Sequence, residues 1–532
     1  MNFLRKLGWL SKTIIVLIII VPAAIFLWPK VEGTLTGGSS PDLVGALNTW
    51  SGFAPIVYLN GGKDVNEDSR LTKEFGLKLK IEQMDVRQNC IDALKEDKVD
   101  FIYNTTDVSP IEMDAQSDFV KMGVQQILKI DGSGSPYGGA DVIVATRSIK
   151  NVNDFRGKKV AVAIGTASHT LLLRVLESGG LTQDDINIVK CPDGIEAAKM
   201  FKNGEVDIAV VWSPDDGDCY AAIKDSHPVF STQQARNIIM DGIVVKESVY
   251  KKKQKDFFKL AIAWLTINAE TNELVRQINP ETFVDEISKL ADGERHNLPA
   301  IYDSIATCFA NTFGAPVFVV ADGMYKVRFS TYGDNVNFFG LNTSFEGVTG
   351  NMLYTKMIKD YREIGLANNP VSWRQASNPS LIQSITTLNS GIHSAESEVS
   401  FSPVTAEIAS AEAVSTKMVS INFALNQYQL DDLAKDKIDK EIGPIIKGFN
   451  GCRFALEGNT DNTGSREINK VISKKRAQSV ADYLMKEWNV KPNQIVRIVG
   501  NGPDKPVVGC ENNSNEYQRS ENRRTEFQLI NQ

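Results

Sequence analysis

One short stretch near the C-terminus constrains the fold of this chain more than any other. The loop from Gly458 to Asp461 directly follows residues 454–457, which favour a strand. Four positions then recur at helical spacing, namely Asn469, Ser473, Arg476 and Val480. We therefore expect a strand, a loop and a helix that place the Asp461 carboxylate opposite the Arg476 guanidinium. Such a pair suits a small zwitterion, because the arginine fork matches a carboxylate and an aspartate matches an ammonium.

The same stretch resembles the OmpA-like peptidoglycan-binding domain, over about residues 416–532. The matching residues are Gly458-Asn459-Thr460-Asp461, Gly464, Asn469, Ser473, Arg476-Ala477 and Asn522-Arg523-Arg524. The resemblance implies that Asp461 binds the ammonium and Arg476 the carboxylate of the stem-peptide diamino acid, with Thr460 and Asn469 in supporting positions. Residues 522–524 are interpreted as structural, because the two arginines alternate across a final strand.

A simpler interpretation of Asp461 and Arg476 is open from the residues alone. An exposed Asp and an Arg on a helix that carries Lys470, Lys474 and Lys475 are usually solvated charges. The whole set of matches, in order and in spacing, favours a binding site over this alternative.

Composition limits the remaining classes of function. A chain of 532 residues predicts two to four domains, and a net charge of −7 argues against general nucleic-acid binding. The four histidines are scattered and no two cysteines form a C-x-x-C pair, so neither a metal site nor a cofactor is expected. In an exported chain, Cys452 with Cys510 and Cys191 with Cys219 are candidate disulfide pairs.

The N-terminus predicts a membrane anchor over residues 1–30. The segment from Trp9 to Trp28 is apolar apart from Ser11, Lys12 and Thr13, and about 20 residues span about 30 Å as a helix. Arg5 and Lys6 precede it and should remain cytoplasmic, which exports the rest of the chain. A cleavable signal peptide is the alternative, but no small-residue cleavage site follows the apolar run.

Residues 41–386 alternate between β-rich and helical segments. This order predicts an α/β fold with mostly parallel sheets and helices on both faces, in two lobes. The stretch from about 140 to 241 is expected to form the second lobe, with chain crossings at 138–141 and 240–242.

A second resemblance supports this division. The segments ADVIVATRSIKNVNDFRGKKVAVAIGTASHTLLLRVLESGGLTQDDINIV and GIEAAKMFKNGEVDIAVVWSPD resemble periplasmic solute-binding proteins of ABC transporters. The most similar group binds nitrate, sulfonates, taurine or thiamine precursors. The resemblance implies a two-lobed periplasmic-binding-protein fold of type II, followed by an α+β OmpA-like domain.

Candidate solute-binding residues lie where strands end, because ligands in such folds bind there, between the lobes. They are Trp50, Thr105, Thr106, Thr166, Ser168, Trp212, Asp215 and Asp241. Thr166 and Ser168 lie between a strand and a helix, where backbone N–H groups favour an anion, although helix capping explains them equally well. The tryptophans would flank the ligand, and the acids would suit an ammonium or hydroxyl group.

Residues 389–416 are rich in Ser, Ala, Glu and Thr and predict a linker before an OmpA-like domain at 417–532. No nucleophile, histidine and acid form a recognisable motif, so no catalytic residue is expected. The sequence thus predicts a single-pass inner-membrane protein whose periplasmic part captures a small anionic or zwitterionic solute and binds peptidoglycan. Its expected partners are the stem peptide, the solute, the membrane and an ABC permease or envelope complex. Two alternatives stay open: a scaffold or motor- or secretion-associated protein, and an α/β transferase.

Overall fold

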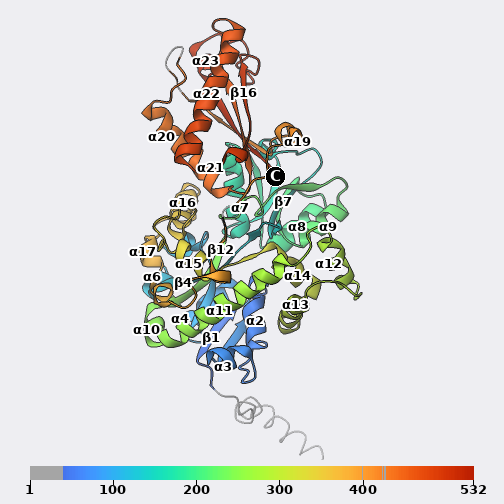
Figure 1. Ribbon diagram of the computed structural model, residues 1–532, viewed down its shortest axis with the longest axis vertical. Helices are drawn as coiled ribbons and strands as arrows, with labels where there is room; N and C mark the ends of the chain where they lie inside the picture. The colour runs from blue at the N-terminus through green and yellow to red at the C-terminus, as the bar shows by residue number, and fades with distance from the viewer. Residues whose placement is uncertain (1–39, 398, 422, 424–426, 532) are drawn as a thin grey trace, which may run out of the picture. The chain divides into compact units, whose positions relative to one another are not determined.

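The computed structural model describes residues 40–397, 399–421, 423 and 427–531 (Figure 1). The chain divides into residues 1–42 and a compact unit, Leu43–Gln532, which is described here. The predicted anchor, residues 1–30, lies outside the described residues. Within the described ranges, no helix is both long enough and apolar enough to cross a membrane.

The first lobe is built on a six-stranded sheet with strand order β13-β4-β12-β3-β1-β2. The strands are β1 (Leu43–Leu47), β2 (Leu79–Gln83), β3 (Phe101–Thr105), β4 (Val124–Gly132), β12 (Met240–Lys246) and β13 (Arg328–Phe329). β1 runs parallel to β2 and β3, whereas β12 runs antiparallel to β3 and β4. The sheet is mixed and not mostly parallel as predicted, because β4 leaves the first lobe and β12 returns to it in the opposite direction.

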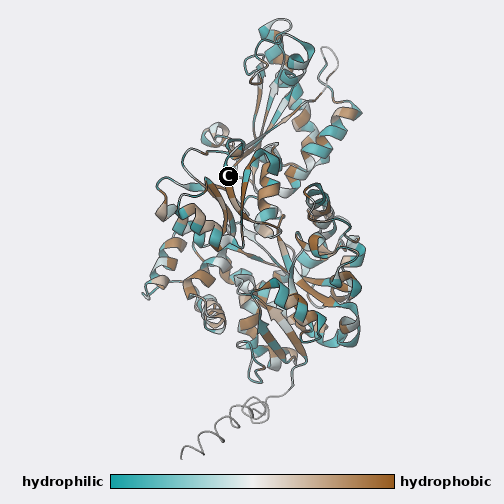
Figure 2. Cartoon of the chain, turned by 180° about the vertical axis from the view of Figure 1, so that it is seen from behind, coloured by the Kyte–Doolittle hydropathy of each residue, from teal (hydrophilic) through white to brown (hydrophobic). Residues whose placement is uncertain are grey.

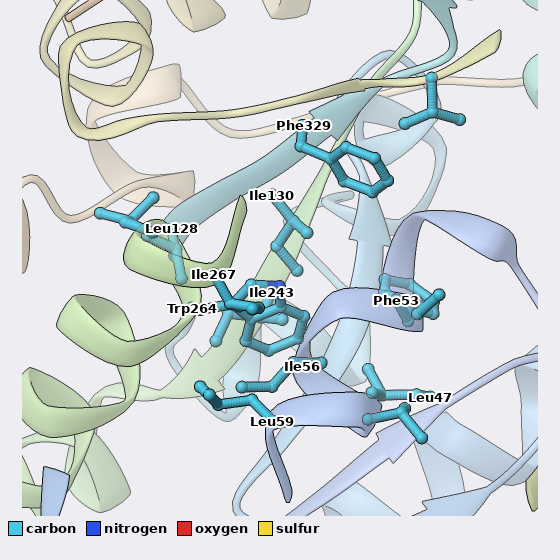
Figure 3. Close-up of a cluster of buried hydrophobic side chains, with 14 of the residues drawn as sticks. Leu47, Phe53, Ile56, Leu59, Leu128, Ile130, Ile243, Trp264, Ile267 and Phe329 are labelled. Carbon is cyan, nitrogen blue, oxygen red and sulfur yellow. The ribbon is translucent and has the colours of Figure 1, made fainter. Parts of the chain in front are cut away.

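Helices cover this sheet and enclose its core. They are α2 (Ala54–Asn60), α3 (Arg70–Phe75), α4 (Arg87–Lys95), α5 (Ser109–Glu112), α6 (Asp118–Lys121), α10 (Glu247–Lys252), α11 (Gln254–Arg276), α12 (Phe283–Ala291), α13 (Ala300–Phe313), α14 (Val317–Lys326), α15 (Tyr332–Phe338), α16 (Gly350–Glu363), α17 (Trp373–Ala376) and α18 (Ser380–Ser384). Figure 3 shows Trp264 of α11 among Ile243, Ile267 and Ile56. Its indole packs edge-on against Phe53, with ring centroids 6.4 Å apart, a favoured geometry for aromatic pairs.

The second lobe is formed by the chain between β4 and β12. Its five-stranded sheet has the order β11-β7-β10-β8-β9. The strands are β7 (Asp141–Ala145), β8 (Lys159–Ala163), β9 (Asn187–Cys191), β10 (Ile208–Trp212) and β11 (His227–Ser231), and the helices are α7 (Ala167–Ser178), α8 (Gly194–Lys202) and α9 (Asp215–Ala222). The short strands β5 (Gly134–Ser135) and β6 (Gly138–Gly139) pair with each other where the chain crosses between the lobes. Figure 2 shows apolar residues along the strands and hydrophilic residues on loops and on the outer faces of helices.

The C-terminal domain is an α+β layer with strand order β14-β17-β15-β16. Its elements are β14 (Ser415–Val419), α20 (Asp432–Glu441), α21 (Gly443–Gly448), β15 (Arg453–Asn459), α22 (Arg466–Glu487), β16 (Ile495–Gly502), α23 (Glu516–Asn522) and β17 (Thr525–Ile530). α22 lies directly on β15 and β16. A Cβ on Gly500 would lie only 2.3 Å from the carbonyl oxygen of Lys470, so glycine permits this close approach.

The C-terminal domain shares a buried hydrophobic cluster with the second lobe. Phe230 packs edge-on against Phe449, with ring centroids 5.2 Å apart. Asn153 exchanges two hydrogen bonds with the backbone of Thr416, both 2.9 Å long. These contacts make the two domains continuous through β14, α21 and α7 (Figure 1).

The predicted linker is ordered against its neighbours. Glu396 donates its backbone N–H to Asp334 of the first lobe, and Arg453 donates to the carbonyl oxygen of Ser402 at 3.1 Å. Residues 406–410 form the short helix α19 (Ala406–Ser410). The segment is therefore packed along the domains it joins, because its small apolar residues cover the outer face of the C-terminal sheet.

All six cysteines are free thiols, so the two candidate disulfides are wrong. Cys452 lies in the shared apolar cluster, whereas Cys510 lies in a turn whose carbonyl oxygen accepts a hydrogen bond from Asn522. The thiols of Cys191 and Cys219 donate to the carbonyl oxygens of Asp193 and Ala198 instead of meeting each other.

Candidate functional sites

The Asp461 carboxylate is held at the end of β15 by two donors. Its Oδ1 accepts the backbone N–H of Thr463 at 2.9 Å, and its Oδ2 accepts Nη1 of Arg523 at 2.7 Å. Burial raises the pKa of Asp461, but the Thr463 amide and Arg523 outweigh it and keep the pKa below its usual value. The site therefore presents a fixed negative charge at neutral pH.

The Arg476 side chain approaches this carboxylate from α22 without an acidic partner. Its Nε donates to the carbonyl oxygen of Gln427 at 3.1 Å, and its guanidinium lies over the Phe423 ring at 4.8 Å. Among the described residues, no carboxylate pairs with Arg476. Burial and the nearby charge of Arg523 lower the pKa of Arg476, which marks a desolvated cation that would gain from an added anion.

The structure corrects the interpretation of Arg523 as purely structural. Asn522 and Arg524 are buried and bond to backbone groups of their own domain, as expected. Arg523 instead reaches Asp461, because the chain leaves α23 at this residue and β17 begins only at Thr525. Arg523 differs from Arg524 in its contact with Asp461, an acid distant in sequence. The alternation of side chains along a strand could not show which of the two arginines would make this contact.

The two supporting positions of this site are both buried. Asn469 donates to the carbonyl oxygen of Thr463 at 3.0 Å and so fixes the loop that carries Asp461. Thr460 donates its backbone N–H to Gly502, while its buried hydroxyl has no hydrogen-bond partner among the described residues. Both residues position the loop.

Strand register assembles part of the predicted solute site on the first lobe. Asp241 lies opposite Thr105 on β3 and opposite Asp131 on β4, so one row of side chains crosses three strands. The indole N–H of Trp50 donates to Oδ2 of Asp131 at 3.1 Å. Three predicted residues are thus brought together, and Asp131 joins them although sequence reasoning missed it.

A second row of candidate residues lies in the other lobe. Asp141 at the start of β7 lies opposite Trp212 at the end of β10. The Trp212 indole N–H donates to the Ser168 hydroxyl on α7 at 3.0 Å. Gly194 lies against this ring, since a Cβ on Gly194 would lie 3.0 Å from it.

A buried network joins the two lobes beside these rows. Thr170 of α7 donates to Oδ2 of Asp107 at 2.7 Å and also contacts the Tyr361 hydroxyl at 2.7 Å. Farther along α7, Lys356 of α16 pairs with Glu177 at 3.2 Å. The lobes therefore meet through hydrogen bonds and ion pairs between α7 and the first lobe.

The other predicted residues have different surroundings. The Thr106 hydroxyl is buried and donates to Gln126 at 3.0 Å, so it serves the framework. Thr166 is the residue before α7, and its hydroxyl donates to the carbonyl oxygen of Ala163 instead of capping the helix. Asp215 begins α9, where burial and nearby acids, Asp218 foremost, raise its pKa.

The cleft is markedly acidic. Burial raises the pKa of Asp131 well above its usual value, and the neighbouring Asp241 raises it further. Burial and Asp241 together raise the pKa of Asp141 to about 7. Burial also raises the pKa of Asp107. Of these acids only Asp241 was predicted from the sequence, since Asp131 lies on another strand and becomes its neighbour only through strand register.

Comparison with known proteins divides the chain in the same places. The fold is a periplasmic-binding-protein-like α/β architecture followed by an OmpA-type domain. Residues 139–263 match the model described as NMT1/THI5 like, and residues 422–523 match the model of the OmpA family. The chain carries an NMT1/THI5-like domain and a C-terminal OmpA domain.

The similar proteins match each domain separately. A protein of Escherichia coli (strain K12) named for binding aliphatic sulfonates is 34% identical over 127 residues, 23% of this chain and 36% of that protein. The peptidoglycan-associated lipoprotein of Pseudomonas putida is 38% identical over 78 residues, 15% of this chain and 44% of that protein. The crystal structure of the periplasmic aliphatic sulphonate binding protein from Escherichia coli is 18% identical with a TM-score of 0.46, covering 65% of this chain and 100% of that one. Each of the two sequence matches spans less than half of the relative's own length.

Proposed function

We propose that this protein captures a small solute between its two lobes while its C-terminal domain binds peptidoglycan. The N-terminal segment, residues 1–30, anchors it in the inner membrane with the remainder in the periplasm. The names of the sulfonate-binding and peptidoglycan-associated relatives support the two halves of this proposal.

The observation that most directly supports peptidoglycan binding is the environment of the Arg476 guanidinium. Its guanidinium is partly buried beside the charged Asp461 and has no carboxylate partner among the described residues. A diamino acid supplies both missing groups: its carboxylate for the Arg476 fork and its ammonium for Asp461. Arg523 already holds one oxygen of Asp461, so the ammonium is expected to share this carboxylate with Arg523.

The test is a pull-down of the full-length protein with purified sacculi. Asp461→Ala or Arg476→Ala should weaken binding by about 30-fold to several thousandfold, since losing one partner of a desolvated charge pair costs about 2–5 kcal/mol. Asp482→Ala and Lys486→Ala remove exposed charges from the same helix and serve as matched controls. Circular dichroism checks that each variant is folded. Wild-type sedimentation of the folded double variant Asp461→Ala/Arg476→Ala would show that the site is elsewhere.

The solute half is supported by polar contacts of both tryptophans, Trp50 with Asp131 in the first lobe and Trp212 with Ser168 in the second. Closure around a solute should change tryptophan fluorescence, because both indoles lie at the boundary between the lobes. Mass spectrometry of small molecules released from the purified protein identifies the solute directly. A scaffold that has lost its ligand would release none and would show no fluorescence response to sulfonates, amines or pyrimidines.

The anchor is tested by sequencing the N-terminus of the mature protein. An intact N-terminus in the membrane fraction is expected. A mature start between Ala24 and Ser40 would replace the anchor with a cleaved signal peptide.

A further inference from the structure

Four buried acidic side chains at the proposed solute site have no ion-pair partner among the described residues. Asp131 lies on β4, Asp241 on β12 and Asp141 on β7, and Asp241 and Asp141 are near enough to Asp107 to raise its pKa. No described Lys or Arg forms an ion pair with any of these four acids. Lys129 is the cation that acts on Asp131 and Asp241, and it does so without direct pairing. A cationic group placed here would favour the ionised form of these acids, because an opposite charge lowers the pKa of a carboxyl group.

Several buried polar atoms around this cluster lack a hydrogen-bond partner within the described part of the chain. They are the Oδ1 atoms of Asp107, Asp131 and Asp141 and the hydroxyl of Ser133. The Ser133 side chain is 2% exposed and lies beside the Asp141 carboxyl group. Buried polar atoms are nearly always paired in folded proteins, so three buried carboxyl oxygens without a partner indicate an absent donor.

We propose that the cleft binds its solute through a positively charged amino group held by Asp131, Asp141 and Asp241. This inference rests on the proposed capture of a solute and names the chemical class of that solute. An ammonium carries three donors and accepts none, which matches a set of acceptors with open oxygens. Trp50 and Trp212 add aromatic faces next to the same carboxylates, and such faces attract cations.

The first turn of α7 offers backbone N–H groups to a second charged group on the same solute. Thr166 does not cap this helix with its side chain, and the helix is 12 residues long. A zwitterion would place its anionic end at this N-terminus and its amino group at the acids. The amino group, and not the anion, sets the specificity in this arrangement, because the acids outnumber the groups that would hold an anion.

Two matched pairs of probes isolate the amino group in isothermal titration calorimetry. The first pair is 2-aminoethanesulfonate and ethanesulfonate; the second is 1,4-diaminobutane and 1,4-butanediol. We expect the amine of at least one pair to bind 30-fold or more tightly than its amine-free partner. Asp131→Asn and Asp141→Asn should each weaken that amine at least 10-fold, whereas the exposed control Asp184→Asn should not.

The outcomes separate this inference from the proposed function. Equal or tighter binding of the amine-free compounds, unaffected by the Asn variants, overturns the inference and leaves solute capture standing. If none of the four compounds binds, native mass spectrometry of the purified protein decides: a bound solute with an amino group supports the inference, and one without overturns it. The absence of any bound solute as well overturns solute capture and the inference together.

Discussion

The contact between Phe230 and Phe449 predicts that the second lobe and the C-terminal domain unfold as one cooperative unit. The two rings are 1% and 0% exposed and belong to one continuous cluster. Removing either buried ring should lower the free energy of unfolding by about 3–5 kcal/mol, because a cavity remains where the side chain packed. In the double variant, Phe230→Ala/Phe449→Ala, the two cavities merge, so the combined loss should fall short of the sum of the single losses.

The shortfall is the coupling energy of the pair. An edge-on aromatic contact contributes about 0.5–1.5 kcal/mol beyond the buried area, and pairs in contact show couplings of about 0.5–3 kcal/mol. We expect about 1–2 kcal/mol from guanidinium chloride unfolding followed by tryptophan fluorescence. The control pair is Phe201→Ala with Phe449→Ala, since Phe201 is buried in a separate cluster of the second lobe. Additivity of Phe230→Ala and Phe449→Ala within about 0.5 kcal/mol, as in the control pair, would refute a shared core.

Three further outcomes are expected. Burial lowers the pKa of His169 to about 4, below the unfolded value of about 6.5. The free energy of unfolding should therefore fall by up to about 1.4 kcal/mol per pH unit as the pH drops from 6.5 to 4. If a His169→Gln variant loses as much stability over this pH range, His169 is not the group responsible. Gly500→Ala should lower the free energy of unfolding by about 1–3 kcal/mol, because a Cβ would meet the backbone of Lys470 and Lys474, whereas Gly217→Ala, with open space around it, should cost less in the same thermal unfolding experiment. Alkylation of the denatured protein without reductant should label all six cysteines in mass spectra, and two or four fewer labels would indicate disulfides.

The C-terminal site was predictable because its residues are close in sequence. The strand β15, the loop with Asp461 and the helix with Arg476 follow one another, and helical spacing alone places Asn469 and Arg476 along α22. Arg523 was not predictable in the same way. It meets Asp461 at 2.7 Å only after β17 has paired with β15, and this pairing depends on contacts far apart in the chain.

The packing of residues 401–416 could not be read from composition. Small polar and apolar residues without periodicity are typical of linkers, and this stretch fits that description. Its order comes from partners elsewhere in the chain. Arg453 and Arg497 donate hydrogen bonds to its carbonyl oxygens, and the Asn153 side chain accepts a hydrogen bond from the backbone N–H of Thr416. A segment whose backbone groups are satisfied by its neighbours is held by them, whatever its own propensity.

The proposed solute site shows most clearly what could not be predicted from the sequence, because strand register decides which side chains meet there. Asp241 and Trp212 were identified as strand ends, but Asp131 and Asp141 become their neighbours only through the pairing of β12 with β4 and of β10 with β7. A shift of one residue would turn these side chains to the opposite face of the sheet. The family resemblance suggested a site for anions or zwitterions. The register adds buried acids that lack ion-pair partners among the described residues, and the proposed amino group on the solute would donate hydrogen bonds to them.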